Sequence, residues 1–177
     1  MKRARVLFLW HMHQPSYLDP LSGSMSMPWV RMHAVRGYLD MARLAAELGD
    51  RAAQTFNFTP CLLDQLEALA SGRTKDDVRV ICEKPTESLD AREREYVLRH
   101  FFSVGYEQNV KPLGRYVALL RKRGGDGEQV DFARARKRFS TAELRDVQVF
   151  FHLAWLGHYA KKDDAHLGEL LEKGGNY

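Results

Sequence analysis

The stretch Val6-Leu-Phe-Leu-Trp10, followed directly by His11-Met-His-Gln-Pro15, decides the fold of this chain. Five consecutive apolar residues without polar alternation are typical of a strand that is covered on both faces, as in a parallel sheet. The polar segment ends this strand, because Pro15 has no backbone N–H to donate and biases Gln14 toward an extended conformation. We therefore predict a buried first strand over Val6–Trp10 that leads into a polar loop.

A second strand and two helices follow along the chain. Apolar residues at helical spacing predict a helix over about Met32–Leu48, with Gly49 as its stop. The segment Ala53–Phe58 has the pattern of a short strand. Thr59-Pro60 is a strong helix start, and leucines at helical spacing extend that helix to Ser71-Gly72. The order strand, helix, strand, helix favours a parallel α/β sheet.

After Gly72 the sequence pattern is mainly helical, with no third strand. Ser88 is expected to cap one helix, and Ser140-Thr-Ala-Glu143 is a capping box that opens a longer one. In that longer helix Phe151 and Trp155 are expected to lie in the core. The predicted helices span about Asp76–Glu83, Ser88–Val104, Pro112–Arg123, Ser140–Tyr159 and Asp164–Lys173.

Two parallel strands cannot cover their own faces or satisfy their own edges. The 177 residues are also too few for a complete (β/α) barrel, which takes about 250 residues. We therefore expect residues 1–72 to form the first two β/α units of a larger barrel. Residues 73–177 would be a helical insertion, with the continuation of the barrel missing. The alternative is a self-sufficient helical domain with a small sheet, which would persist as an oligomer that pairs its edge strands.

Composition and charge narrow the class of protein. Lys and Arg number 27 against 23 Asp and Glu, a net charge of +4, which lacks the strong basic bias of a dedicated nucleic-acid binder. Cys61 and Cys82 have no CxxC spacing and are expected to be reduced core residues. No apolar run approaches the length of about 18 residues that a membrane span needs. The run Val6–Trp10 is too short for a signal peptide, so we expect a cytoplasmic protein.

The histidines at the end of the first strand are the main candidates for function. Active sites of parallel α/β proteins form at the C-terminal ends of the strands. His11 and His13 stand two residues apart, so both side chains leave the strand in the same direction. Such a pair can hydrogen-bond a substrate or ligate a metal.

Four stretches together resemble glycoside hydrolase family 57. They are His11-Met-His-Gln-Pro15, Pro28-Trp-Val-Arg-Met-His33, Thr55-Phe-Asn-Phe-Thr-Pro-Cys-Leu-Leu-Asp-Gln65 and Asp146-Val-Gln-Val-Phe-Phe-His-Leu-Ala-Trp-Leu156. The resemblance implies an incomplete (β/α)7 barrel that acts on α-glucans, as an α-amylase, 4-α-glucanotransferase, branching enzyme or amylopullulanase. It also implies a retaining reaction without a cofactor.

Retention uses two carboxyl groups about 5–5.5 Å apart. In the family these belong to a Glu and an Asp on later strands, and the sequence ends before either motif. We therefore assign no catalytic residue, and we expect the isolated chain to have no glycosidase activity.

The resemblance suggests which residues bind the α-glucan or oligosaccharide. His11 and His13 would hydrogen-bond the sugar at the cleavage point, while Gln14 and Pro15 would shape the loop.

Four further residues have two interpretations each. Trp29 would stack on a glucose ring or anchor its loop. Arg31 and His33 begin a helix near the same rim, where capping and surface contacts are the favoured alternative. Asn57 would face the same cleft as His13 or bond its own backbone in a turn.

Two other classes of function remain open. The two histidines could be ligands of a metal-dependent barrel hydrolase, although His100, His152, His158 and His166 show no recognisable ligand spacing. A non-catalytic binding module could use the basic run Arg134-x-Arg136-Lys-Arg138, with Phe132 and Phe139, to contact phosphates. A solvated helical face explains that run better, and we expect neither a nucleic acid nor a membrane partner.

Overall fold

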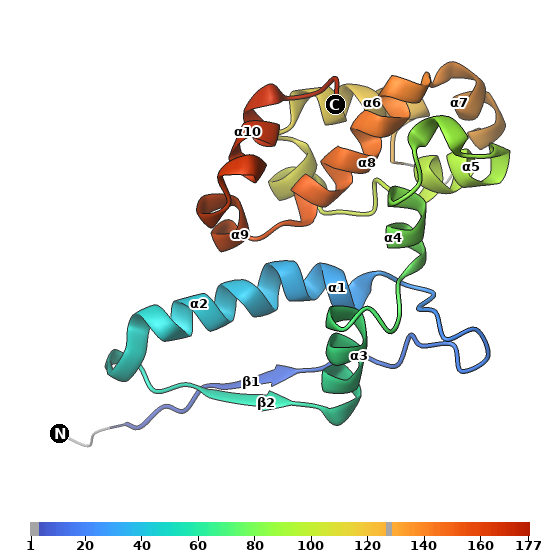
Figure 1. Ribbon diagram of the computed structural model, residues 1–177. Coiled ribbons are helices and arrows are strands. Elements are labelled where there is room, and N and C mark those ends of the chain that lie inside the picture. The colour runs from blue at the N-terminus through green and yellow to red at the C-terminus, as the bar shows by residue number, and fades with distance from the viewer. Residues whose placement is uncertain (1–3, 127–128) are drawn as a thin grey trace. The chain divides into compact units, whose positions relative to one another are not determined.

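The computed structural model describes residues 4–126 and 129–177 (Figure 1). The chain divides into two compact units. The first comprises Met1–Arg79 with Gly157–Ala160, and the second comprises Val80–Leu156 with Lys161–Tyr177. Each unit is described by itself below. The predicted boundary between residues 72 and 73 concerns the units of a barrel and stays a prediction.

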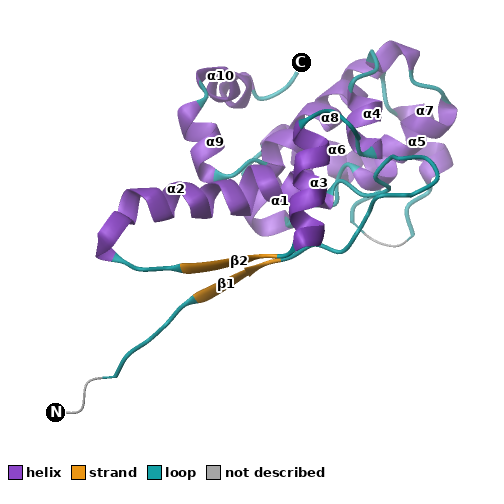
Figure 2. Cartoon of the chain, turned by 60° about the horizontal axis from the view of Figure 1, so that its bottom comes forward, coloured by secondary structure: helices purple, strands orange, loops and turns teal. Residues whose placement is uncertain are grey.

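The first unit contains a two-stranded parallel sheet of β1 (Leu9–Met12) and β2 (Thr55–Phe58). Figure 2 shows the two strands side by side. Their register pairs Leu9 with Thr55 and Met12 with Phe58. Within the described residues, these two strands are the whole sheet, so an α/β architecture with two parallel strands is confirmed.

The predicted position of the first strand was wrong by three residues at its start. Val6 and Leu7 precede β1 and are 75% and 78% exposed. The ladder begins only where the Thr55 backbone N–H donates to the Phe8 carbonyl oxygen. The apolar run therefore has the composition of a covered strand, whereas in the described structure it is uncovered.

The helical segment of the first unit is interrupted. In place of one helix over about Met32–Leu48, the structure has α1 (Trp29–His33), a π-helical segment (Ala34–Tyr38) and α2 (Leu39–Leu48). Helix α2 ends with Gly49 as its C-cap residue, as predicted, and a 3₁₀ turn (Gly49–Arg51) follows it. Gly49 takes a positive φ of 50°, a conformation that glycine adopts without strain.

Helix α3 (Pro60–Ala70) follows β2 directly. Thr59 is its N-cap residue and Pro60 lies in its first turn, as predicted, but the Thr59 side chain makes no capping hydrogen bond.

The core of the first unit lies between the helices and one face of the sheet. Its buried members are Met12, Met25, Val30, Leu62 and Leu69. Tyr17, Tyr38, Met41, Phe56 and Leu66 pack against them. Met12 of β1 and Phe56 of β2 point to this core. Since side chains alternate along a strand, their neighbours in the two strands point to the other face of the sheet. On that face Leu9, His11, Thr55 and Asn57 are exposed.

The second unit is helical in its described residues. Its central helix is α8 (Thr141–Trp155), which packs against α5 (Ala91–His100) and α6 (Gly114–Arg123). The remaining elements are α4 (Asp77–Cys82), a 3₁₀ turn (Thr86–Ser88), a π-helical segment (Tyr106–Val110), α7 (Phe132–Arg138), α9 (His158–Asp163) and α10 (Ala165–Lys173). Helices α4 and α9 cross from one unit to the other.

The helix ends test the capping predictions. Ser140 and Glu143 form the predicted capping box of α8. Helix α5 is capped by Asp90, which forms a capping box with Glu93, so the prediction of Ser88 as its cap was wrong. Ser88 instead donates its hydroxyl to the Pro85 carbonyl oxygen.

Helix α8 ends at Trp155 rather than near Tyr159, because Leu156 has an extended backbone with ψ 138°. Phe151 lies in the core as predicted, whereas Trp155 is only half-buried. Cys61 and Cys82 are free thiols, and both are half-buried rather than in the core. Among the described residues, no helix combines the length and apolar character needed to cross a membrane.

Candidate functional site

Four polar side chains line the exposed face of the sheet at its C-terminal end. His11 and Asn57 stand opposite each other in the β1–β2 register, and the His11 Nδ1 lies 2.7 Å from the Asn57 Oδ1. Beyond the strand ends, the His13 Nδ1 lies 3.3 Å from the Thr59 Oγ1. The two imidazole rings are stacked, with centroids 5.8 Å apart and planes at 10°. We call these four residues the histidine face.

The contact with Asn57 fixes the chemistry that His11 can offer. An amide oxygen only accepts hydrogen bonds, so the His11 Nδ1 carries the hydrogen and donates it. In the neutral ring, Nε2 is then an acceptor. Asn57 retains its amide NH2 group as a donor. A ligand hydroxyl, which both donates and accepts, is matched by this arrangement.

The loop after β1 is held in place by two tyrosines. The Tyr17 hydroxyl donates to the Gln14 Oε1 at 3.2 Å, and the Gln14 Nε2 donates to the Tyr38 hydroxyl at 3.5 Å. Tyr38 in turn donates to the His13 carbonyl oxygen at 3.4 Å. Burial, together with the nearby Tyr38, raises the pKa of Tyr17, so its hydroxyl keeps the proton that it donates. Gln14 thus bonds to Tyr38, which supports the backbone of His13, and it is not part of the histidine face.

Gln65 is a second support of this loop, and the sequence analysis did not single it out. Its Nε2 donates to the carbonyl oxygens of Pro15 and Cys61, both at 3.0 Å, and its Oε1 accepts from the Tyr17 N–H at 2.8 Å. The side chain is buried on α3. A signal was present, since Gln65 falls on the same helical stripe as Leu62 and Leu69 and is the polar member of an apolar face.

Arg31 forms an ion pair with a buried carboxylate. Its Nε and one terminal nitrogen donate to the two carboxylate oxygens of Asp76 at 2.6 and 2.9 Å. The Asp76 carboxylate is fully buried and also accepts from the Arg79 N–H at 2.9 Å. No local pattern indicates this partner, which lies 45 residues away along the chain.

Trp29 and His33 lie at the two ends of α1. Trp29 opens the helix and is half-buried, and its role at the rim stays a prediction. The ring of His33 lies 6.5 Å from that of Tyr38. Burial, and then the charge of Arg36, lower the pKa of His33, which therefore favours the neutral ring. The structure brings His11, His13 and Asn57 together directly, and Gln14 indirectly through Tyr38.

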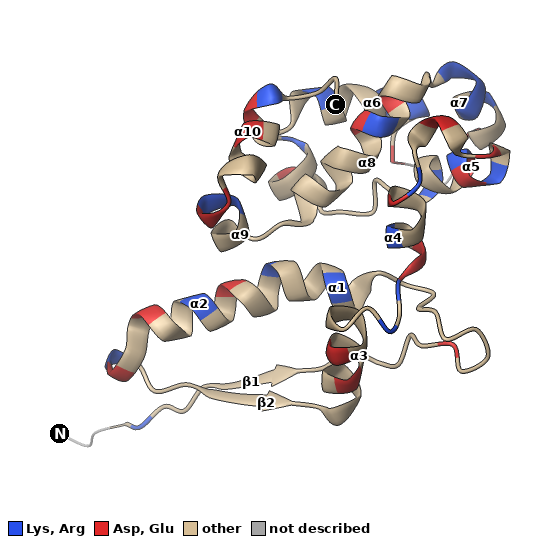
Figure 3. Ribbon diagram, in the orientation of Figure 1, with Lys and Arg blue, Asp and Glu red and all other residues tan. Residues whose placement is uncertain are grey.

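The two alternative functions gain no support from the described residues. No group of three or more His, Cys, Asp or Glu side chains is arranged there to hold a metal ion. On the basic helix α7, coloured blue in Figure 3, the Phe132 ring lies under the Arg99 guanidinium at 4.0 Å. Phe139 is buried, with Lys122 over its ring. Phe139 is therefore not available for a nucleic-acid base to stack on, and one face of the Phe132 ring is already covered by Arg99.

The comparisons with known proteins agree with the sequence motifs. The model of the family described as "Glycosyl hydrolase family 57" matches residues 7–159, which include the histidine face, its supports and all of α8. The search of curated proteins and the search of solved structures gave no match. Because the family match spans most of the chain, the chain belongs to glycosyl hydrolase family 57.

Proposed function

We propose that this chain provides the sugar-binding N-terminal part of a retaining glycoside hydrolase or 4-α-glucanotransferase that acts on α-glucans. One observation carries the proposal: His11, His13 and Asn57 project from one face at the C-terminal ends of two parallel strands. In barrel enzymes this end of the strands bears the active site. The family membership supports a carbohydrate substrate.

The histidine face has the hydrogen-bonding capacity that a sugar requires. Each sugar hydroxyl can donate to one group and accept from another. The His11 Nε2 supplies an acceptor and the Asn57 amide supplies a donor. Tyr38 and Gln65 hold the loop that follows β1, so His13 is already ordered before a sugar binds. Binding then costs little additional conformational entropy at this residue.

The uncovered sheet supports the barrel part of the proposal. Leu9 and Trp10 are exposed on opposite faces of β1, and Val6 and Leu7 continue the exposed apolar run. A cavity of about 210 Å³ beside Trp10 also remains between the sheet and α2. Additional strands would cover these surfaces and satisfy the free edges. Pairing of two copies through their edge strands is the alternative way to do so.

The reaction itself would depend on the Glu and Asp that the family carries on later strands. We therefore propose that the isolated chain binds sugar without cleaving it. An assay for new reducing ends on soluble starch should show no turnover above buffer. Turnover that copurifies with the chain would overturn this part. The free thiols of Cys61 and Cys82 are compatible with the proposed cytoplasmic location.

Isothermal titration with maltoheptaose tests the binding directly. We expect a dissociation constant of about 1 mM, because the described residues of the histidine face contact the sugar from one side. His13→Ala should weaken binding at least about tenfold, which corresponds to about 1.4 kcal/mol. His166→Ala is the matched control, since His166 is an exposed histidine of α10 in the second unit. Equal binding by both variants and the parent chain would contradict the proposal.

A further inference from the structure

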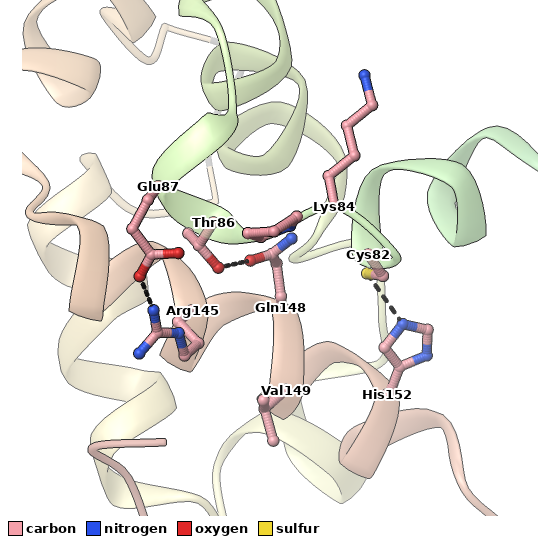
Figure 4. A pocket seen from close by; sticks show the side chains of 9 residues that line it. Cys82, Lys84, Thr86, Glu87, Arg145, Gln148, Val149 and His152 are labelled. Carbon is pink, nitrogen blue, oxygen red and sulfur yellow. Dashed lines mark hydrogen bonds and ion pairs between the residues drawn. The ribbon is translucent and has the colours of Figure 1, made fainter.

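The second unit contains a cavity of about 350 Å³ that the proposed function does not use (Figure 4). One wall runs from the end of α4 into the following 3₁₀ turn, and the other is formed by α8. The lining residues are Cys82, Lys84, Pro85, Thr86, Glu87, Arg145, Gln148, Val149 and His152. A cavity of this size accommodates a small organic molecule.

A cysteine and a histidine face each other at this cavity. The Cys82 Sγ lies 3.2 Å from the His152 Nε2, as the dashed line in Figure 4 marks. Cys82 is half-buried, so its sulfur forms part of the cavity wall and is not sealed in the core. An imidazole nitrogen at this distance can take up the thiol proton, which generates the nucleophilic thiolate.

The rest of the cavity fixes this pair in position. The Thr86 hydroxyl donates to the Gln148 Oε1 at 2.8 Å, and both side chains are buried. The Gln148 Nε2 donates to the Ile81 carbonyl oxygen at 3.5 Å. Gln148 and His152 are four residues apart and share one face of α8. The Gln148 contacts therefore hold α8 against the segment that carries Cys82.

Charged side chains also line the cavity. Lys84 and Arg145 are cationic, and Glu87 is anionic and paired with Arg145. Lys84 is also paired, with Glu93 outside the lining. Both cations are thus matched by carboxylates, so the charge that favours the Cys82 thiolate is the imidazolium formed when His152 takes up the thiol proton.

We propose that Cys82 is a thiol activated by His152 and a site of reversible modification by small disulfide compounds that enter this cavity. The Cys82 thiol passes its proton to the His152 Nε2, and the thiolate sulfur attacks one sulfur of the disulfide. A bond forms between these two sulfurs as the original S–S bond breaks. The departing thiolate takes the proton from His152, so Cys82 becomes a mixed disulfide and one free thiol leaves.

Cys61 is an internal control for this reactivity. It is half-buried like Cys82, but the group near its sulfur is the Gln65 Nε2 at 3.5 Å. An amide cannot take up a proton, so it cannot act as the base for Cys61. The chain therefore offers two thiols of similar exposure that differ in the nature of the neighbouring group.

The test follows the reaction of the full chain with 5,5′-dithiobis(2-nitrobenzoate), which releases one coloured thiolate per attack. Cys61→Ser leaves Cys82 as the reactive thiol, and Cys82→Ser leaves Cys61. At about pH 7 we expect Cys82 to react at least about threefold faster, since a larger thiolate fraction is offset by a weaker nucleophile. Equal rates, or a faster reaction of Cys61, would overturn the proposal. Both variants keep His152, so this comparison does not depend on a change at that residue.

A second measurement separates activation from simple exposure. Between about pH 8 and pH 7 the rate of an ordinary thiol falls about eightfold, because its thiolate fraction falls by that factor. In the Cys61→Ser chain the rate should fall less than about twofold. Adding His152→Gln to that chain should restore the steep dependence. A steep dependence with His152 present, or a shallow one without it, would refute the role of the imidazole.

Discussion

Replacing Asp76 by Asn should lower the free energy of unfolding of the first unit by about 3 kcal/mol. The Asp76 side chain is 1% exposed and accepts hydrogen bonds from both Arg31 and the Arg79 N–H. Removing one partner of a buried ion pair costs about 3–5 kcal/mol, because the other charge is left without compensation. The Arg31 side chain is 19% exposed, so water compensates part of that loss and the lower end of the range applies.

Urea titration with peptide-resolved hydrogen exchange measures this effect in the first unit separately from the second. Glu67→Gln is the matched control in the same unit. It removes an ion pair with Arg73 in which the charged atoms lie 3.6 Å apart and the side chains of Arg73 and Glu67 are 62% and 76% exposed. This substitution should change the free energy of unfolding by less than about 0.5 kcal/mol. If Asp76→Asn changes the free energy of unfolding as little as Glu67→Gln does, the ion pair between Arg31 and Asp76 does not stabilise the fold. Arg31 would then again be a candidate for binding sugar.

Two further predictions concern packing and pH. In Gly157→Ala the new Cβ would lie 2.6 Å from both carboxylate oxygens of Asp40, so calorimetry should show a loss of about 1–3 kcal/mol. Gly168→Ala has open space around it in α10 and should gain about 0.5–1 kcal/mol; a loss in both variants would contradict this. Because burial lowers the pKa of His33, the unfolded chain binds a proton more readily, and stability should fall as the pH drops below about 6.5. His33→Gln should remove that part of the acid sensitivity, and an unchanged pH dependence of the urea midpoint would count against it.

Local patterns predicted which segments form helices and strands better than where each of them begins and ends. Ser140 with Glu143 gave the correct start of α8 because the whole capping box is local in sequence. The same rule would have placed the start of α5 at Asp90, since Glu93 follows three residues later, whereas Ser88 has no acidic residue at that spacing. The first strand was predicted to start three residues too early, because hydrophobicity does not reveal which residues pair with a neighbouring strand. The paired residues of β1 are those that lie opposite the four residues of β2.

The site was predictable where it depends on strand geometry and unpredictable where it depends on distant contacts. Alternation along the strand placed His11 and His13 on one face. The contact of Asn57 with His11 required the parallel register, which brings together residues 46 positions apart. The ion pair of Arg31 with Asp76 is equally distant in sequence and left no local signal. Such contacts follow from tertiary packing and not from spacing along the chain.

The most direct test of the account is an NMR titration of the chain with maltoheptaose, observed at the histidine rings and the Asn57 side-chain amide. The account predicts shifts that saturate together at His11, His13 and Asn57, with His166 unchanged as the internal reference. It also predicts smaller shifts with a β-linked glucose oligomer of the same length. Shifts confined to the second unit, or none at millimolar sugar, would contradict the assignment of the histidine face as the sugar-binding site.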